Sequence, residues 1–169
     1  LLVSLASVTI SYLSEVIDVN VILINLFGNS TTGKSTICKF AVSLFGYPGI
    51  KENGLFFTYN ATDNAIMKRM EGIYGCPIAI DELSMSDSKK KNLVYKFHSG
   101  KNKYRLNQDS SQKENDGWLG SVFTNGEKSL IKSSSKNVGV QLRVIEVANV
   151  QWTKSAEHAE KINEVIMNN

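Results

Sequence analysis

The feature that most constrains the fold is a glycine-containing loop between two stretches of different periodicity. Residues 21–27 form a continuous apolar run rich in β-branched side chains, which is typical of a strand covered on both faces in a parallel sheet. The loop Gly28–Ser35 follows directly, and from Lys34 onward apolar residues recur at helical spacing until Gly46. This order of strand, loop and helix predicts an α/β unit.

The same alternation continues along the chain. We expect further strands at residues 55–59, 76–80, 118–123 and 140–147, and helices that begin near Thr62 and near Ser86 or Asp87. The polar stretch 107–117 is typical of a hairpin tip or a loop. Together these elements predict an α/β three-layer sandwich with a mostly parallel central sheet.

The length of 169 residues and the 42% hydrophobic content predict one domain with its own core. Residues 1–20 are expected to form a leading helix, residues 21–150 the core, and residues 151–169 a tail with one amphipathic helix. Because the chain begins with Leu1, we expect it to be a piece of a longer protein. The leading helix is expected to bury an apolar face made of Leu2, Leu5, Val8, Tyr12, Leu13, Val16 and Ile17.

The cysteine content and the hydropathy pattern argue against several classes of protein. Cys38 and Cys76 are the only cysteines, and no Cys or His pair has metal-ligand spacing, so neither a disulfide framework nor a zinc site is indicated. The apolar opening at residues 1–17 is too short to span a bilayer and lacks a basic leader. We therefore expect a cytoplasmic protein with no membrane partner.

The loop Gly28–Ser35 matches the phosphate-binding pattern G-x-x-x-x-G-K-[ST] in full and lies between an expected strand and an expected helix. Its glycines allow successive backbone N–H groups to point at phosphates, and the helix adds its positive dipole end. Lys34 is expected to reach the β and γ phosphates of ATP, and the Ser35 hydroxyl to ligate Mg²⁺. The expected nucleotide contacts are Gly28, Asn29, Ser30, Thr31, Thr32, Gly33, Lys34, Ser35 and Thr36.

Two adjacent carboxylates, Asp81 and Glu82, end the apolar run 78–80. Because side chains alternate along a strand, the two acids point in different directions and suit different roles. We expect Asp81 to hold Mg²⁺ and Glu82 to orient or deprotonate the attacking water. Without the phosphate loop, an Asp-Glu pair would more simply mark the start of a surface loop.

The segment Ser121–Gly126 is an apolar strand that ends in Thr124 and Asn125. A polar amide at Asn125 is suited to contact the γ-phosphate or to position water. The alternative, which spacing alone leaves open, is a simple Asn-Gly turn after an edge strand.

The net charge of +3 conceals a strongly basic segment, because residues 89–105 hold seven Lys or Arg and no acid. The rest of the chain is acidic in balance. Composition alone favours a solvated helix face over a binding surface for such a segment.

Taken in order, the phosphate loop, the Asp81-Glu82 strand end and the Thr124-Asn125 strand end resemble the Walker A, Walker B and sensor 1 series of AAA+ ATPases. More narrowly, the chain resembles the helicase-like ATPase domain of phage and plasmid primase-helicase proteins. This family carries the designation domain of unknown function and is similar to superfamily 3 helicases. Further matching segments are Thr58–Thr62, Gly100–Arg105 and Asn125–Glu127.

The resemblance to superfamily 3 helicases implies a β-hairpin before sensor 1, in residues 103–123, that carries basic residues to DNA. It implies single-stranded DNA or a DNA fork as partner. Backbone phosphate contacts would then come from Lys101, Lys103, Arg105 and Lys113. Tyr104 and Trp118 are either base-stacking groups or, as their hydrophobicity favours, part of the packing at the base of the hairpin.

The resemblance also implies a homo-oligomeric ring in which a neighbouring subunit supplies an arginine to each active site. Arg143 is the first candidate for this arginine and Arg105 the second, with Arg69 and Lys132 as the remaining cations considered. The simpler alternative for each is a surface ion pair.

Together these features predict an ATP-hydrolysing motor domain that translocates on or unwinds DNA. One alternative is a nucleotide-switched assembly or defence ATPase for which DNA is irrelevant. Another is a small-molecule kinase, which Glu82 and the lack of an evident acceptor-binding lid disfavour.

Overall fold

The computed structural model of the chain describes residues 1–169 with the exception of 52, 61, 83–86, 102–116, 133–137 and 169. Helices and strands alternate along most of the described chain. They run in the order α1 (Leu2–Leu13), β1 (Ile22–Phe27), α2 (Lys34–Ser43), β2 (Phe56–Thr58), α3 (Asp63–Met70), β3 (Ile78–Asp81), α4 (Asp87–Ser99), β4 (Ser121–Gly126), α5 (Val138–Gln141), β5 (Val144–Ala148) and α6 (Ala156–Asn168).

The strands form one five-stranded sheet in the order β2-β3-β4-β1-β5, and all of its pairs are parallel. The predicted α/β fold with a mostly parallel sheet is therefore confirmed. Strand β4 lies between β1 and β3, although it follows both in sequence. The carboxyl ends of these three strands consequently meet at one edge of the sheet, where α/β proteins commonly bind ligands.

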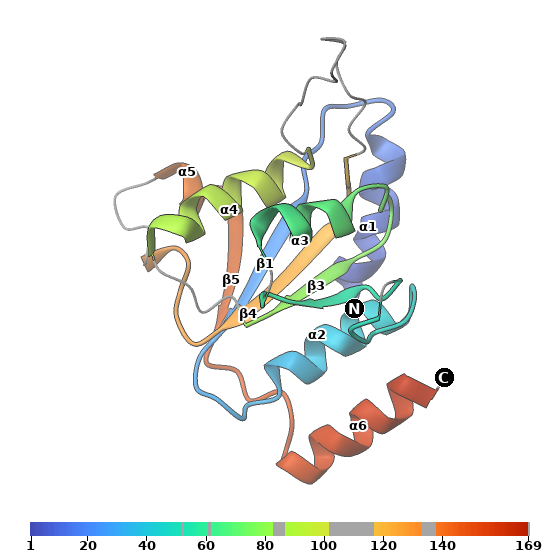
Figure 1. Cartoon of the computed structure of the whole chain (residues 1–169), viewed down its shortest axis with the longest axis vertical. Helices are drawn as coiled ribbons and strands as arrows, with labels where there is room; N and C mark the ends of the chain where they lie inside the picture. Colours follow the sequence, from blue (N-terminus) through green and yellow to red (C-terminus); the bar gives the residue numbers. More distant parts are fainter. Residues whose placement is uncertain (52, 61, 83–86, 102–116, 133–137, 169) are drawn as a thin grey trace.

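Helices cover both faces of the sheet, so the fold has three layers (Figure 1). Leu23 of β1 packs in the cluster beneath α3 and α4, whereas Ile24 packs in the cluster beneath α2. This alternation explains why residues 21–27 are apolar throughout, because both sides of β1 are buried. Helix α6 contacts the outer side of α2, which lies between α6 and the sheet.

Local sequence signals explain where α3 begins, which side of α4 is buried and where α4 ends. The Thr62 side chain accepts a hydrogen bond from the backbone N–H of Ala65 and caps α3, as the sequence predicts. In α4, Leu93, Val94 and Phe97 share the buried side of the helix. Gly100 follows α4 with a φ of +63°, in the left-handed region that glycine adopts at low cost.

Helix α1 forms where it was expected, but it buries the opposite face. The buried residues are Ser4, Ser7 and Ile10, whereas Leu2 is 82% exposed and the other apolar residues expected to be buried are also exposed. The physical reason is that α1 packs closely against the start of β4 and against Gly120, the residue before it. The Ser7 hydroxyl accepts a hydrogen bond from the Ser121 N–H at 3.0 Å, and a Cβ on Gly120 would lie 3.2 Å from the Ser7 Cβ.

The prediction of a strand at residues 140–147 is wrong for residues 140–143. Val138–Gln141 forms the short helix α5, in which the N–H groups of Leu142 and Arg143 bond to the carbonyls of Val138 and Val140. Strand β5 starts only at Val144, which is paired with Leu23 of β1. The chain becomes extended where a neighbouring strand offers partners for its backbone groups.

The predicted hairpin tip and its basic residues Lys103, Arg105 and Lys113 lie outside the described residues. Of the segment before β4, Trp118 is described and is only 2% exposed. Its indole N–H donates to the Phe97 carbonyl at 3.1 Å. Trp118 is thus part of the core, which favours the packing alternative over base stacking.

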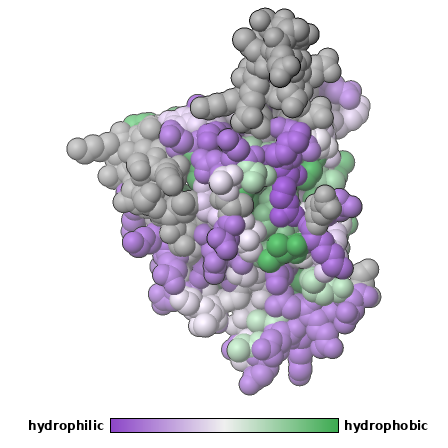
Figure 2. Space-filling model, viewed as in Figure 1, coloured by the Kyte–Doolittle hydropathy of each residue, from purple (hydrophilic) through white to green (hydrophobic). Residues whose placement is uncertain are grey.

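The outer surface of the described residues is mainly hydrophilic in the view of Figure 2. Helix α6 lies at the bottom of this view and has no fully buried residue. No helix within the described ranges is long and apolar enough to cross a membrane.

Candidate nucleotide site

The loop Gly28–Gly33 connects β1 to α2, and two of its glycines are required by close packing. A Cβ on Gly28 would lie 2.8 Å from Asn149 Oδ1, and a Cβ on Gly33 would lie 2.6 Å from Thr153 Cγ2. Gly33 also has a φ of +83°, which disfavours any other residue. The segment that follows β5 further supports the loop, because the Trp152 N–H donates to the Thr32 carbonyl at 2.8 Å.

The Lys34 ammonium lies at the mouth of the loop. It donates to the Gly28 carbonyl at 3.1 Å and to the Asn29 carbonyl at 2.5 Å. These contacts place a flexible cation where the loop and the start of α2 concentrate positive potential. The phosphate contact that the sequence predicts for Lys34 stays a prediction.

Three polar side chains distant in sequence meet beside the loop. Ser35 Oγ donates to Asp81 Oδ1 at 2.8 Å, and Asn125 Nδ2 donates to the same carboxylate oxygen at 2.5 Å. Asn125 Nδ2 also lies 3.3 Å from Ser35 Oγ. The structure therefore brings together the predicted metal residues and the predicted sensor residue, because β4 lies between β1 and β3.

Asn125 is a strand residue and not part of a simple turn. It is 3% exposed, and its Oδ1 accepts a hydrogen bond from the Glu82 backbone N–H at 2.9 Å. Glu82 itself has a φ of +60°, which is uncommon for a residue with a side chain. Its side chain is exposed and lines the cleft beside the loop. Asn125 thus holds the backbone that presents Glu82.

A buried polar network lies next to Asn125 along β4. Thr124 Oγ1 donates to Asn25 Oδ1 at 3.1 Å, and Asn25 Nδ2 donates to Glu146 Oε1 at 2.8 Å. Glu146 in turn accepts the Leu130 N–H at 2.7 Å. These bonds join β4, β1 and β5 on the face below α4 and α5, and they satisfy polar groups that would otherwise destabilise the core.

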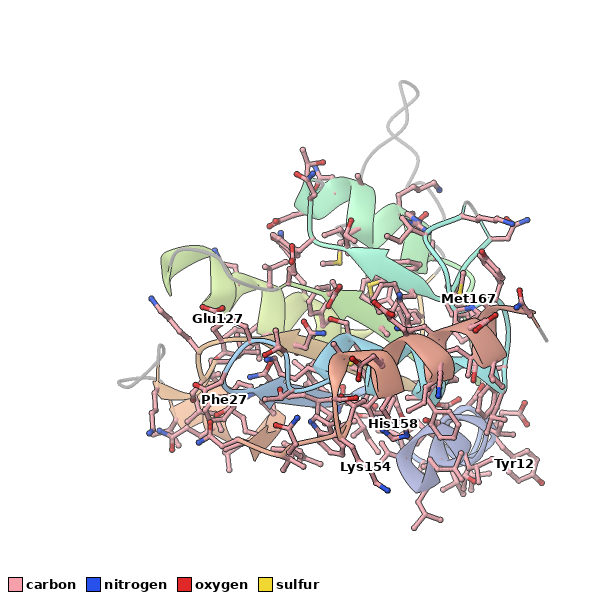
Figure 3. The ribbon with its side chains drawn as sticks, turned by 90° about the horizontal axis from the view of Figure 1, so that it is seen from below. Tyr12, Phe27, Glu127, Lys154, His158 and Met167 are labelled. Atoms are coloured by element: carbon pink, nitrogen blue, oxygen red, sulfur yellow. The ribbon has the colours of Figure 1, made fainter. Side chains whose placement is uncertain are left out.

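A cleft of about 630 Å³ opens over these residues. In Figure 3 the phosphate loop lies between Glu127 on one side and the N-terminal end of α6 on the other. The cleft is lined by Ser30, Thr31, Gly33, Lys34, Ser35, Thr36, Glu82, Asn125, Gly126, Glu127, Ala156, Ala159 and Glu160. Of the predicted loop contacts, Ser30, Thr31, Gly33, Lys34, Ser35 and Thr36 are in this lining.

Two contributors to the cleft were not assigned a role from the sequence. Glu127, two residues after Asn125, accepts a hydrogen bond from Ser30 Oγ at 2.8 Å. Ala156, Ala159 and Glu160 reach the cleft from α6. The amphipathic pattern of residues 154–169 reveals a helix, but nothing in the local sequence indicates that this helix packs against α2.

The Cys38 thiol lies in α2 below the site, and burial raises its pKa to about 12, with the nearby Asp81 carboxylate adding to the shift. A thiol in this environment stays protonated and is a poor nucleophile. The cysteine is therefore a packing residue.

Arg143 is not brought into the cleft of its own chain. It precedes β5, whereas the phosphate loop follows the opposite end of the neighbouring strand β1. Its guanidinium donates to the Gly139 carbonyl at 2.7 Å and lies 5.0 Å from the centre of the Tyr95 ring. Arg69 stacks on Phe57, Lys132 is exposed, and Arg105 lies outside the described residues.

Lys101 is exposed and lies near the start of β1. The preceding Gly100 is close to Val21, and the Trp118 N–H donates to the Gly100 carbonyl. Lys101 and the phosphate loop are therefore at opposite ends of the sheet. This arrangement separates the described part of the basic segment from the cleft.

We compared the chain with known protein families and solved structures to identify its family. Residues 1–117 match the family described as Domain of unknown function (DUF927). Among solved structures, the chain is similar to one described as "SCCmec type IV Cch - active helicase", with 32% sequence identity and a TM-score of 0.80. The match covers 98% of this chain and 30% of that one, and comparison with the curated proteins finds no match. The chain is thus a helicase-like domain that belongs to the DUF927 family.

Proposed function

We propose that this chain is the ATP-hydrolysing motor domain of a protein that translocates on or unwinds DNA. The observation that carries the proposal is the meeting of Ser35 from the first turn of α2, Asp81 from the end of β3 and Asn125 from the end of β4 beside the phosphate loop. The similarity to a protein described as an active helicase, over 98% of the chain, supports a nucleic acid as the partner, and DNA is part of the proposal. Because the chain spans 30% of the length of that helicase, the activity of the whole protein is part of the proposal.

The residues present fit a nucleotide accompanied by Mg²⁺. Ser35 and Asp81 offer hard oxygen ligands at one point of the cleft, which Mg²⁺ prefers. Within the described ranges there is no cluster of three or more His, Cys, Asp or Glu side chains that could hold a metal by themselves. This donor set suits an ion whose remaining ligands are phosphate oxygens and water, and which neutralises charge on the phosphates when it is bound.

The proposed chemistry assigns a separate task to each side chain. The loop N–H groups and Lys34 bind the β and γ phosphates and stabilise the charge that develops on them. Glu82 accepts a proton from water as the water oxygen bonds to the γ-phosphorus and the bond to the bridging oxygen breaks. Asn125 positions Asp81 and the Glu82 backbone through the bonds described above. For Arg143 to serve the active site of a neighbouring subunit in a ring, its guanidinium would have to leave the Gly139 carbonyl and the Tyr95 ring.

The proposal is tested by ATP hydrolysis with and without single-stranded DNA, using the chain and the Lys34→Ala variant. We expect hydrolysis that DNA stimulates, and no nucleotide binding by the variant, because it lacks the phosphate-contacting cation. A Lys68→Ala variant changes an exposed lysine of α3 and should behave as the unmodified chain does.

The outcomes separate the DNA part of the proposal from the nucleotide part. Unchanged rates with DNA and no DNA binding at low salt would contradict the motor function. If rings formed with a slowly hydrolysed ATP analogue under those conditions, the nucleotide-switched assembly module would be the correct alternative. Phosphorylation of a small-molecule acceptor would instead identify a kinase.

A further inference from the structure

A second cavity lies between α2 and α6 and has no role in the phosphate chemistry. Its volume is about 210 Å³, and it is lined by Thr36, Ile37, Phe40, Trp152, Thr153 and Ile162. Two of the six side chains are aromatic and two are aliphatic, and the polar groups are the two threonine hydroxyls. Such a cavity is suited to the flat, mostly apolar faces of a ring system.

The cavity adjoins the phosphate cleft along α2. Thr36 lines both spaces, and Thr153 of the cavity abuts Gly33 of the phosphate loop. An α-helix rises about 1.5 Å per residue, so Phe40 lies about 9 Å farther along α2 than Lys34. Because Thr36 lines both spaces, a nucleotide whose terminal phosphates contact Lys34 and whose α-phosphate lies toward Thr36 would place its base at this part of the helix.

A buried acceptor without a partner lies at the junction of the two spaces. Asn163 of α6 donates from Nδ2 to Thr36 Oγ1 at 3.4 Å, while its Oδ1 is buried and accepts no hydrogen bond from the described residues. Buried polar atoms are nearly always paired, so a donor is missing at this point. A sugar hydroxyl of a nucleotide bound across the two spaces would supply that donor.

We propose that the cavity between α2 and α6 binds the base of the nucleotide, and that α6 is the element that recognises it. The inference rests on the proposed function, because it requires triphosphate binding at Lys34. Apolar pockets discriminate weakly between ligands of similar shape, whereas sites that hydrogen-bond the edges of a ligand discriminate strongly. We therefore expect ATP and GTP to bind with similar affinity.

The test compares MgATP, MgGTP and magnesium tripolyphosphate, which contains the phosphate chain without sugar or base. The probing variant is Ile162→Ser, and Val165→Ser is its matched control, because Val165 is on the same helix, is 60% exposed and does not line the cavity. We expect Ile162→Ser to weaken ATP and GTP binding about tenfold, through the loss of apolar contact, and to leave tripolyphosphate binding unchanged. Val165→Ser should bind all three ligands as the unmodified chain does.

Tryptophan fluorescence of the unmodified chain gives a second measurement that does not depend on the folding of a variant. Trp152 lines the cavity, whereas Trp118 is buried in the core on the other face of the sheet. ATP should change the emission of Trp152 and tripolyphosphate should not, and Trp152→Phe should remove the response.

Two different failures are distinguishable. In the first, Ile162→Ser binds ATP as tightly as the unmodified chain, ATP leaves the emission of Trp152 unchanged, and tripolyphosphate still competes with ATP. The proposal of a base pocket is then wrong, and the proposal of a phosphate site stands. If neither ATP nor tripolyphosphate binds any of these proteins, the proposed function is wrong and the base pocket is overturned with it.

Discussion

Asn125 Nδ2 lies 2.5 Å from Asp81 Oδ1, although the two residues are 44 positions apart in the chain. The contact joins the carboxyl ends of β4 and β3, on the side of the sheet where the phosphate loop follows β1. Through its other amide atom, Asn125 also fixes the backbone of Glu82. One buried amide thus contacts both acids at the end of β3, the Asp81 side chain and the Glu82 backbone.

Replacing Asn125 by alanine should impair both stability and hydrolysis. The change removes one of the two donors to the half-buried Asp81 carboxylate and leaves the Glu82 N–H without its partner, at a cost of about 1–3 kcal/mol in the free energy of unfolding. Misplacement of Glu82 should lower hydrolysis by roughly 10²-fold. Chemical denaturation and a phosphate-release assay measure the two effects, and Asn92→Ala, at an exposed position of α4, is the control. Full activity of Asn125→Ala would remove Asn125 from the site.

The Glu82→Gln variant should bind ATP normally and lose hydrolysis. Glutamine keeps the shape of the side chain but accepts no proton from water, and loss of a general base lowers rates by about 10²–10⁴-fold. Glu127→Gln is the comparison, because Glu127 lines the same cleft and contacts Ser30 of the loop. Steady-state hydrolysis and equilibrium nucleotide binding separate the two variants. If Glu127→Gln were the inactive one, the role of base would pass to Glu127.

Gly33→Ala should destabilise the chain more than Gly72→Ala. Both glycines have φ near +80°, where an alanine costs about 1–2 kcal/mol. A Cβ on Gly33 would in addition overlap with Thr153, whereas a Cβ on Gly72 meets nothing within 4 Å. Thermal unfolding of the two variants should therefore differ, and Thr153→Gly should restore part of the loss in Gly33→Ala. Equal melting temperatures for the two alanine variants would show that the loop does not pack against Thr153.

Helix α1 offers a direct test of which face is buried. Leu5→Ser changes a residue that is 49% exposed and should alter the free energy of unfolding by no more than about 0.5 kcal/mol. Ser7→Leu should cost about 1–3 kcal/mol or more, because the larger side chain cannot fit beside Gly120 and the bond to Ser121 is lost. Urea denaturation of the two variants measures the difference. The reverse order would show that the apolar stripe is the buried one.

Stability should fall on mild acidification because of His98. Burial, with a smaller contribution from the nearby Arg143 charge, lowers the pKa of His98 below its usual 6.5, despite the contact of its Nδ1 with the Val21 carbonyl. The folded state therefore favours the neutral ring. The stabilising contribution is complete above about pH 6.5 and is lost as the pH falls through the lower pKa of the folded state.

The measurement is the free energy of unfolding as a function of pH, in the unmodified chain and in His98→Asn. Asparagine can still donate to the Val21 carbonyl but does not titrate in this range. The decrease below about pH 6.5 should be smaller in the variant. An identical pH dependence would mean that His98 contributes nothing to it.

The sequence by itself determined the elements whose signals are local. The apolar run before Gly28 and the spacing of Gly33, Lys34 and Ser35 predict a strand, a phosphate loop and a helix, because only a few residues are needed to set each conformation. The cap at Thr62 is predicted for the same reason. The presence of an acidic strand end, Asp81-Glu82, downstream of the loop Gly28–Ser35 is likewise evident from the order of residues alone.

Only the tertiary structure decided which distant groups meet. The position of β4 between β1 and β3 brings Asn125 to Asp81, and the docking of α6 on α2 adds a wall to the cleft and creates the second cavity. Helix α1 buries serines instead of leucines because glycine and serine allow its backbone to approach β4 closely. Strand pairing and helix docking depend on contacts between residues far apart in the chain, and local periodicity contains no information about which partner will be present.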